Sequence, residues 1–202
     1  MLDDKQVRRS RLRLPARQNG VAAVEFALLS IIFLTLLFGI MEIARIAYVV
    51  NTLQEVTRRA AAAAANSNFD QDSVDEIRQQ SLFRDGSGNL VLANFITPDH
   101  LKVEYLSISR DATGALVPQP ASPLPACPEQ NQINCTTDPY GASCIRLVRV
   151  RVCQPGGAGD CAPVPYEELF SFVDFSRFRL PRSATIAPAQ TLGSRFGTLA
   201  CP

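Results

Sequence analysis

The sequence contains a single histidine, His100, and no tryptophan. Nucleophilic triads need a histidine beside the nucleophile, and structural zinc sites usually pair cysteines at Cys-x-x-Cys spacing, which is absent here. A glycine-rich phosphate loop, a serine elbow and a His-Glu-x-x-His pattern are also missing. We therefore expect no catalytic residue, no metal site and no cofactor, and a structural protein rather than an enzyme.

Net charge is low as well, at +1 over 202 residues. Most basic residues of the N-terminal part fall in a leader, residues 1–20, where only Asp3 and Asp4 oppose them. The basic residues of the leader are Lys5, Arg8, Arg9, Arg11, Arg13 and Arg17. The rest of the chain is therefore slightly acidic, which argues against a nucleic-acid partner.

One long apolar run follows the leader directly. The span, Val21 to Met41, contains a single charge, Glu25. A helix needs roughly 20 largely apolar residues to cross a bilayer, and basic residues before it keep the N-terminus cytoplasmic. The sequence therefore predicts a single-pass membrane protein whose C-terminal part is exported.

Glu25 is costly in this position, by about 2–4 kcal/mol at depth in a membrane. One interpretation is that the carboxylate reaches back to the headgroups of an ordinary signal anchor. The other is that cleavage after Gly20 creates an α-amine on Val21 with which a carboxylate can pair.

The leader, Gly20 and the run Gly-Val-Ala-Ala-Val-Glu-Phe-Ala-Leu-Leu that it opens resemble the TadE-like pseudopilins (minor pilins) of tight-adherence, or Flp, type IV pilus systems. The resemblance covers about the first quarter of the chain. It implies cleavage between Gly20 and Val21 by a prepilin peptidase, and pairing of Glu25 with the N-terminus of a neighbouring subunit. The major pilins carry tyrosine where this chain has Phe26, which favours a minor component.

The resemblance also implies a setting and partners. The setting is the bacterial inner membrane, with the C-terminal domain periplasmic. The partners are membrane lipid, the peptidase, other pilin and pseudopilin subunits, and an assembly platform with its ATPase. The role is to initiate, prime or tip an adhesion pilus, and entry into the filament itself is left open. Two alternatives stay open: a signal-anchored periplasmic binding or scaffold domain, and a type II secretion pseudopilin.

We expect three parts: the leader 1–20, a span-and-stalk helix 21–66, and an exported α+β domain 67–202 with a Pro/Cys-rich loop at about 112–165. The stalk, residues 42–66, continues the helix because apolar residues recur at helical spacing. These residues are Ile43, Ile46, Val50, Leu53 and Ala60. Glu42–Arg45 and Glu55–Arg59 add charge pairs at helical spacing.

In the exported domain we expect a small, mostly antiparallel sheet. The predicted strands are Leu90–Ile96, Leu101–Ser109, Ile145–Val152 and Ser183–Ala189. Asp70 or Asp72 should cap a helix, Ser73–Phe83, and Asp85–Asn89 should form a turn. The aromatic segment Tyr166–Leu180 is predicted to be a short helix, with an edge strand as the alternative. Arg146, Arg149 and Arg151 are predicted to lie on a solvated sheet face rather than in an anion site.

All six cysteines lie in the predicted exported part, which indicates disulfides. They are Cys127, Cys135, Cys144, Cys153, Cys161 and Cys201. Many pairings are open to six cysteines. Equal spacing favours Cys127–Cys135 and Cys153–Cys161, which leaves Cys144 with Cys201.

Overall fold

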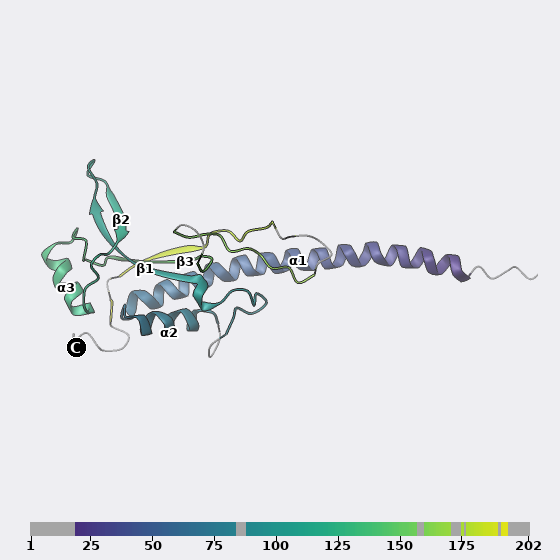
Figure 1. Ribbon diagram of the computed structural model, residues 1–202, viewed down its shortest axis with the longest axis horizontal. Helices are drawn as coiled ribbons and strands as arrows, with labels where there is room; N and C mark the ends of the chain where they lie inside the picture. Colours follow the sequence, from purple (N-terminus) through teal and green to yellow (C-terminus); the bar gives the residue numbers. More distant parts are fainter. Residues whose placement is uncertain are drawn as a thin grey trace, which may run out of the picture.

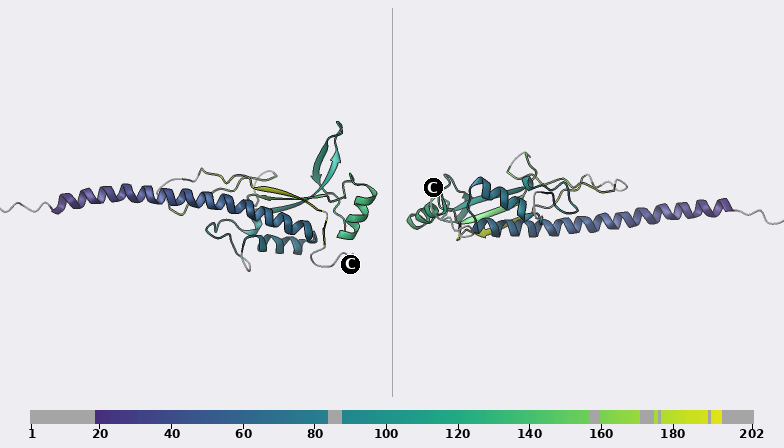
Figure 2. Two further views of the ribbon diagram at one scale, coloured as in Figure 1. Left: turned by 180° about the vertical axis from the view of Figure 1, so that it is seen from behind. Right: turned by 90° about the horizontal axis from the view of Figure 1, so that it is seen from below.

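The chain forms a long helix that projects from a small α+β head (Figure 1). The computed structural model describes residues 19–83, 88–156, 160–170, 175, 177–189 and 191–193. Most of the predicted leader lies outside these residues. Helix α1 (Asn19–Asn66) stands clear of the head in its first half and lies along it in its second half (Figure 2). The expected α+β fold with a long N-terminal helix and an antiparallel sheet is confirmed.

The stalk half of α1 carries one buried stripe. The members of that stripe are Glu42, Val49, Leu53, Val56, Thr57, Ala60, Ala61, Ala64 and Ala65. Separations of three, four and seven keep them on the side of the helix that faces the head. Of the predicted stripe, Leu53 and Ala60 are fully buried, whereas Ile43 is 60% exposed and was assigned to the wrong side.

The sheet has four antiparallel strands in the order β2-β1-β3-β4. Their bounds are Leu101–Arg110 (β1), Leu116–Pro120 (β2), Leu147–Val152 (β3) and Ala184–Pro188 (β4). The predictions for β1, β3 and β4 are confirmed. Alternation turns Val148, Val150 and Val152 toward the core beneath α1, because successive side chains of a strand point to opposite faces.

Strand β2 is an edge strand within the segment predicted to be a Pro/Cys-rich loop. Two prolines interrupt its alternation, but Ala121 N–H donates to Tyr105 C=O at 2.9 Å, so the nitrogens of Pro118 and Pro120 lie on the outer edge. No ladder hydrogen bond is lost there, and an edge on which two prolines remove the outward N–H donors resists pairing with a foreign strand.

The second helix, α2 (Gln71–Ser81), packs beside the end of α1 (Figure 1). Asp70 is its N-cap, and Asp70 Oδ1 accepts from Ser73 N–H at 3.1 Å. Val74 and Ile77 bury its apolar side. The predicted helix and its cap are therefore confirmed, with Asp70 rather than Asp72 in the capping position.

The predicted strand Leu90–Ile96 is wrong. Leu90, Ala93 and Ile96 are buried, but Leu92 has a φ of 60°, and turn hydrogen bonds join Leu90 N–H to Ile96 C=O and Ile96 N–H to Ala93 C=O. The apolar residues anchor a compact turn instead of a ladder. The predicted turn at Asp85–Asn89 falls largely outside the described residues.

The predicted helix Tyr166–Leu180 is also wrong in its described part. Two limbs of this segment lie antiparallel, with a bridge between Pro165 and Arg179, and Tyr166 N–H donates to Phe178 C=O at 3.1 Å. Rings cluster across the limbs, since Tyr166 meets Phe95 and Phe178 edge-on. Backbone pairing across the loop thus replaces helical hydrogen bonding.

Helix α3 (Pro128–Thr137) was not predicted, and it overturns part of the disulfide pairing. Cys127 caps α3, and Cys135 lies near the other end of the helix, about 12 Å further along its axis. A disulfide needs Cα atoms about 4.4–6.8 Å apart, so the predicted Cys127–Cys135 bond is wrong. Cys135 instead bonds Cys144, with the Cα atoms 4.8 Å apart. That bond also excludes the predicted Cys144–Cys201. Cys127 is disulfide-bonded too, but to neither of these two residues.

The predicted Cys153–Cys161 bond is present, with Cα atoms 4.9 Å apart. It closes a short loop after β3 and carries Asp160 onto the outer face of the sheet. Cys201 lies outside the described residues.

The outer face of the sheet is a network of ion pairs. Glu104 lies opposite Arg149 and accepts from it at 2.8 Å and from Arg151 at 2.7 Å, while Arg151 also donates to Asp160 at 2.6 Å. Burial raises the pKa of Glu104, but the hydrogen bonds from Arg151 and Arg149 outweigh it, so the pKa lies below its ordinary value. Of the three arginines predicted to be solvated, Arg146 is exposed. Arg149 and Arg151 are partly buried, since each donates to carboxylates of the protein itself.

Candidate functional site: the exposed helix and its junction with the head

The predicted cleavage position lies in the first turn of α1. Val21 is 56% exposed, and a Cβ added at Gly20 would meet no described atom within 4 Å. The first N–H groups of a helix have no intrahelical partner, so the N–H groups of this turn make no bonds within the helix. The Gly20–Val21 peptide bond is thus accessible from outside the fold.

Glu25 lies one helical turn beyond Val21, about 6 Å further along the axis. Residues four apart lie on the same helix face, so Glu25 and Val21 share one side of α1. Among the residues that the structure describes, Glu25 has no hydrogen-bond or ion-pair partner, and Phe26 beside it is 73% exposed. The carboxylate is therefore directed outward, away from anything its own chain provides.

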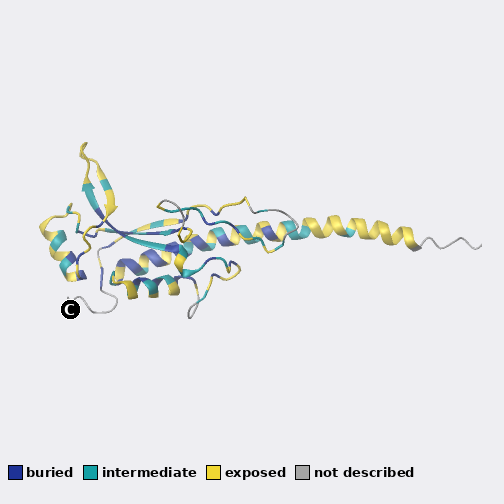
Figure 3. Cartoon of the chain, in the orientation of Figure 1, coloured by how far each residue is buried: buried dark blue, intermediate teal, exposed yellow. Residues whose placement is uncertain are grey.

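The free half of α1 is an apolar surface that the head leaves largely uncovered (Figure 3). From Val21 to Met41 its large apolar side chains are between 45% and 73% exposed, except for Leu37 and Phe38, which are half-buried. By length and composition α1 is able to cross a membrane, with a mean hydropathy of 2.5 in its most apolar window, and none of that window is buried. So large an exposed apolar surface marks contact with lipid or with other subunits. This helix can serve as a single-pass membrane anchor.

A buried polar junction begins where the span ends. Glu42 is 2% exposed, and its Oε1 accepts from Tyr166 O–H at 2.6 Å, from Arg45 Nη1 at 3.0 Å and from Leu169 N–H at 3.2 Å. Its Oε2 has no partner within the described part of the chain. Burial, together with the hydrogen bond to Glu42, raises the pKa of Tyr166 above its ordinary value.

Arg45 completes the junction by tying two loops to one turn of α1. Its Nε donates to Leu92 C=O at 2.8 Å and its Nη1 donates to Glu167 C=O at 2.9 Å. The guanidinium also lies over the rings of Tyr166, at 5.2 Å, and Phe95, at 5.9 Å. Loops far apart in sequence are thereby held to the helix just beyond its apolar run.

Only part of this arrangement is predictable from the sequence. The expected helix pair of Glu42 and Arg45 is confirmed, at 3.0 Å. Their partners Tyr166, Leu92 and Leu169 are not indicated by the sequence. The signal available was a charged pair directly after an apolar run, but nothing local indicates partners more than 40 residues away.

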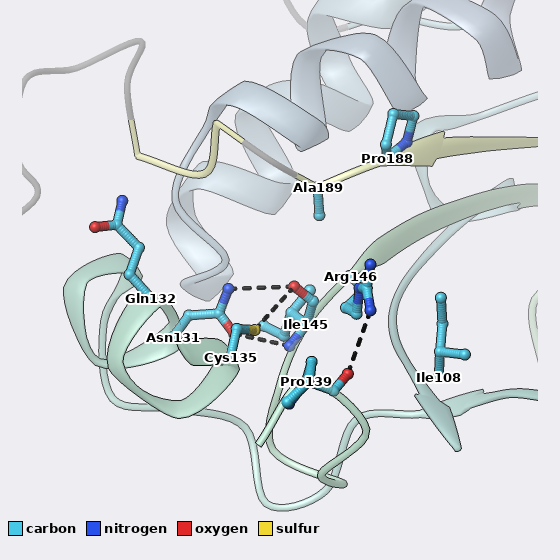
Figure 4. Close-up of a pocket in the computed structure, with 9 residues that line it drawn as sticks. All are labelled: Ile108, Asn131, Gln132, Cys135, Pro139, Ile145, Arg146, Pro188 and Ala189. Atoms are coloured by element: carbon cyan, nitrogen blue, oxygen red, sulfur yellow. Dashed lines mark hydrogen bonds between the residues drawn. The ribbon is translucent and has the colours of Figure 1, made fainter. Parts of the chain in front are cut away.

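The other hollows of the head show internally satisfied polar groups. A shallow pocket of about 380 Å³ lies between α3 and the sheet edge (Figure 4). There Asn131 pairs with the backbone of Ile145, donating at 3.2 Å and accepting at 2.7 Å, while Arg146 reaches Pro139 C=O (Figure 4). A second hollow, of about 500 Å³, lies between the stalk and the side chains of Phe83, Leu90 and Val91, and it is mainly apolar.

His100 has a structural place. Its Nδ1 accepts from Thr97 N–H at 3.1 Å and caps the short turn before β1, and burial lowers the pKa of its imidazole. Across the described ranges, no three of the histidine, cysteine, aspartate and glutamate side chains group as metal ligands would.

Comparison with known proteins agrees with the N-terminal geometry. No curated protein and no solved structure matches the chain. Residues 20–62, which include the predicted cleavage position, the apolar run and most of the stalk, match the family model described as TadE-like protein. The match confirms the resemblance found in the sequence. The N-terminal part of the chain, residues 20–62, is therefore similar to the TadE-like family.

Proposed function

We propose that this protein is a minor pilin, or pseudopilin, that takes part in assembling a Tad (Flp) pilus. In this proposal α1 holds the precursor in the bacterial inner membrane, with its N-terminus cytoplasmic and its head periplasmic. A prepilin peptidase then cleaves the chain after Gly20. The observation that carries the proposal is the uncovered apolar half of α1, whose single charge, Glu25, lies one turn from the new N-terminus at Val21.

Glu25 has a physical role in this proposal. A lone carboxylate in a membrane or in a bundle of apolar helices is unfavourable, and an opposite charge within a few ångströms relieves that penalty. The free α-amine on Val21 of a neighbouring subunit supplies such a charge. Because Glu25 has no described partner in its own chain, it is available to select and align that neighbour.

The role is proposed to be structural rather than catalytic. His100, the only histidine, is used as a turn cap, and the sequence has no phosphate-binding loop. The energy for moving the subunit would therefore come from a partner ATPase that acts through an assembly platform. The other proposed partners are pilin and pseudopilin subunits, and adhesion would be the function of the finished pilus.

The mature N-terminus tests the proposal. The full chain is expressed with and without a prepilin peptidase, and the product is measured by mass spectrometry. The proposal predicts a product that begins at Val21 only when the peptidase is present. An intact Met1 terminus beside a peptidase that cleaves a known prepilin would refute it and favour a signal-anchored periplasmic domain.

Two variants separate processing from assembly. Gly20→Ala should abolish cleavage, and because an added Cβ there meets no described atom within 4 Å, the loss cannot be attributed to misfolding. Glu25→Ala should still be cleaved yet fail to support piliation. Glu55→Ala is the matched control, since it removes a half-exposed helix carboxylate whose pair with Arg59, at 3.3 Å, lies on the stalk. Equal piliation by Glu25→Ala and Glu55→Ala would refute the assembly role of Glu25.

A further inference from the structure

A loop of the head reaches back onto the span. The rings of Phe38 and Phe170 have centroids 4.8 Å apart, and both side chains are half-buried. Phe38 lies three residues before Met41, where the apolar run ends, so this contact is about 4–5 Å inside the end of the span. The head therefore touches a part of α1 that a bilayer would surround.

Large apolar side chains lie exposed around the same level. Leu92 is 59% exposed and Leu169 is 64% exposed, each in one of the two loops that Arg45 ties to α1. Ile43, on the helix between the span and Arg45, is 60% exposed. We call these three residues the collar. At the end of the span, Ile40 is 59% exposed and Met41 is 50% exposed.

Backbone polar groups of the collar have hydrogen-bond partners within the protein. Glu42 accepts the N–H of Leu169, and Arg45 donates to the carbonyl of Leu92. Backbone groups near hydrocarbon are costly unless they find partners within the protein. The two charged side chains of the junction thus satisfy backbone groups of the residues that carry the collar's leucines.

We propose that the collar contacts the lipid of the periplasmic leaflet, at the level where acyl chains meet headgroups. This inference rests on the proposed function, which places α1 in the membrane. Arg45 and Tyr166, directly behind the collar, are residue types that favour this level, because each joins an apolar body to a polar end. The collar would hold the head against the membrane surface and set its angle to α1 before assembly.

The absence of tryptophan in the chain makes a direct test possible. Single substitutions Leu92→Trp and Leu169→Trp introduce one fluorophore each into the full chain, which is reconstituted in phosphatidylcholine–phosphatidylglycerol vesicles. Brominated lipids then quench any tryptophan that touches acyl chains. Leu116→Trp is the matched control, since it replaces a leucine that is 55% exposed on β2, at the far end of the head (Figure 1). Phe33→Trp, in the middle of the span, reports insertion of α1.

We expect Leu92→Trp and Leu169→Trp to show blue-shifted emission and strongest quenching by lipids brominated high on the acyl chain. Phe33→Trp should be quenched best by deep bromines, and Leu116→Trp should be neither shifted nor quenched. If Phe33→Trp is quenched but Leu92→Trp and Leu169→Trp behave like Leu116→Trp, the lipid contact of the collar is refuted and the membrane placement of α1 is kept. If the emission of Leu92→Trp and Leu169→Trp is blue-shifted but not quenched, the lipid contact is refuted, and the collar is instead covered by protein, such as a second copy of the chain. An unquenched Phe33→Trp would overturn the membrane placement itself.

Discussion

Removal of the Glu42 carboxylate should loosen the head from the stalk. Glu42→Ala leaves Tyr166 O–H, Leu169 N–H and the Arg45 guanidinium without their shared acceptor, in a place where Glu42 itself is 2% exposed. Deleting one member of a buried charged pair costs about 3–5 kcal/mol, because the partner stays buried and unpaired. Arg45 keeps its two carbonyl acceptors, so we expect the lower part of that range, about 3 kcal/mol.

Thermal unfolding of the full chain in nanodiscs, followed by near-ultraviolet circular dichroism, measures this loss. A change of 1 kcal/mol moves the midpoint by roughly 2–4 °C in a protein of this size, so Glu42→Ala should unfold roughly 6–12 °C below the wild type. Glu55→Ala is the control, because its pair with Arg59 is about half exposed and should contribute no more than about 0.5 kcal/mol.

A double-mutant cycle shows whether the loss comes from the junction. If Glu42 acts through Arg45, Glu42→Ala combined with Arg45→Ala should cost less than the sum of the single variants, by about 1–3 kcal/mol. A midpoint for Glu42→Ala equal to that of Glu55→Ala would refute the reasoning. Strict additivity in the cycle would show that the contacts do not act together.

Three further predictions concern the head. The pKa of Glu104 is lowered in the folded state, so the contribution of Glu104 to stability is complete above the ordinary value of 4.5 and is lost as the pH falls through the lowered folded value. The difference in unfolding free energy between wild type and Glu104→Gln, measured by denaturant unfolding, should therefore shrink at acid pH. A difference that stays constant with pH would contradict the pairing with Arg151. Replacing Cys135 and Cys144 together by serine removes a bond that spans nine residues and should lower the free energy of unfolding by about 2–3 kcal/mol, with a smaller effect contradicting a structural role. Asp70→Ala deletes the cap of α2 and should cost about 1 kcal/mol by the same measurement, whereas no change would show that the cap is replaced by water.

The elements that were predicted correctly are those whose pattern is local. The long helix α1 follows from an apolar run with one charge and from helical spacing beyond it. Helix α2 follows from Asp70 and the apolar pair behind it, and β1 and β3 follow from alternation. Each of these signals depends on neighbours within a few residues, which is the range over which helical and strand periods act.

The wrong predictions fall where apolar composition was clear but backbone geometry was not. Leu90–Ile96 and Tyr166–Leu180 are rich in apolar residues, and both do contribute to the core. Burial alone does not distinguish a strand from a tight turn, and the turn at Leu92 depends on hydrogen bonds to atoms on either side of it. The pairing of Cys135 with Cys144 depends in turn on α3, whose polar sequence gives only a weak helical signal.

By itself the sequence determined the long apolar helix and its isolated charge at Glu25, because hydropathy and charge order along one helix need no tertiary contact. Cleavage after Gly20 stays a prediction. Only the tertiary structure decided what lies at the end of that helix. Glu42 meets Tyr166 across a separation of 124 residues, and Phe38 meets Phe170 across a still longer one. Such contacts arise when the sheet packs on the stalk and carries its loops back to the span, so no local pattern could have indicated them.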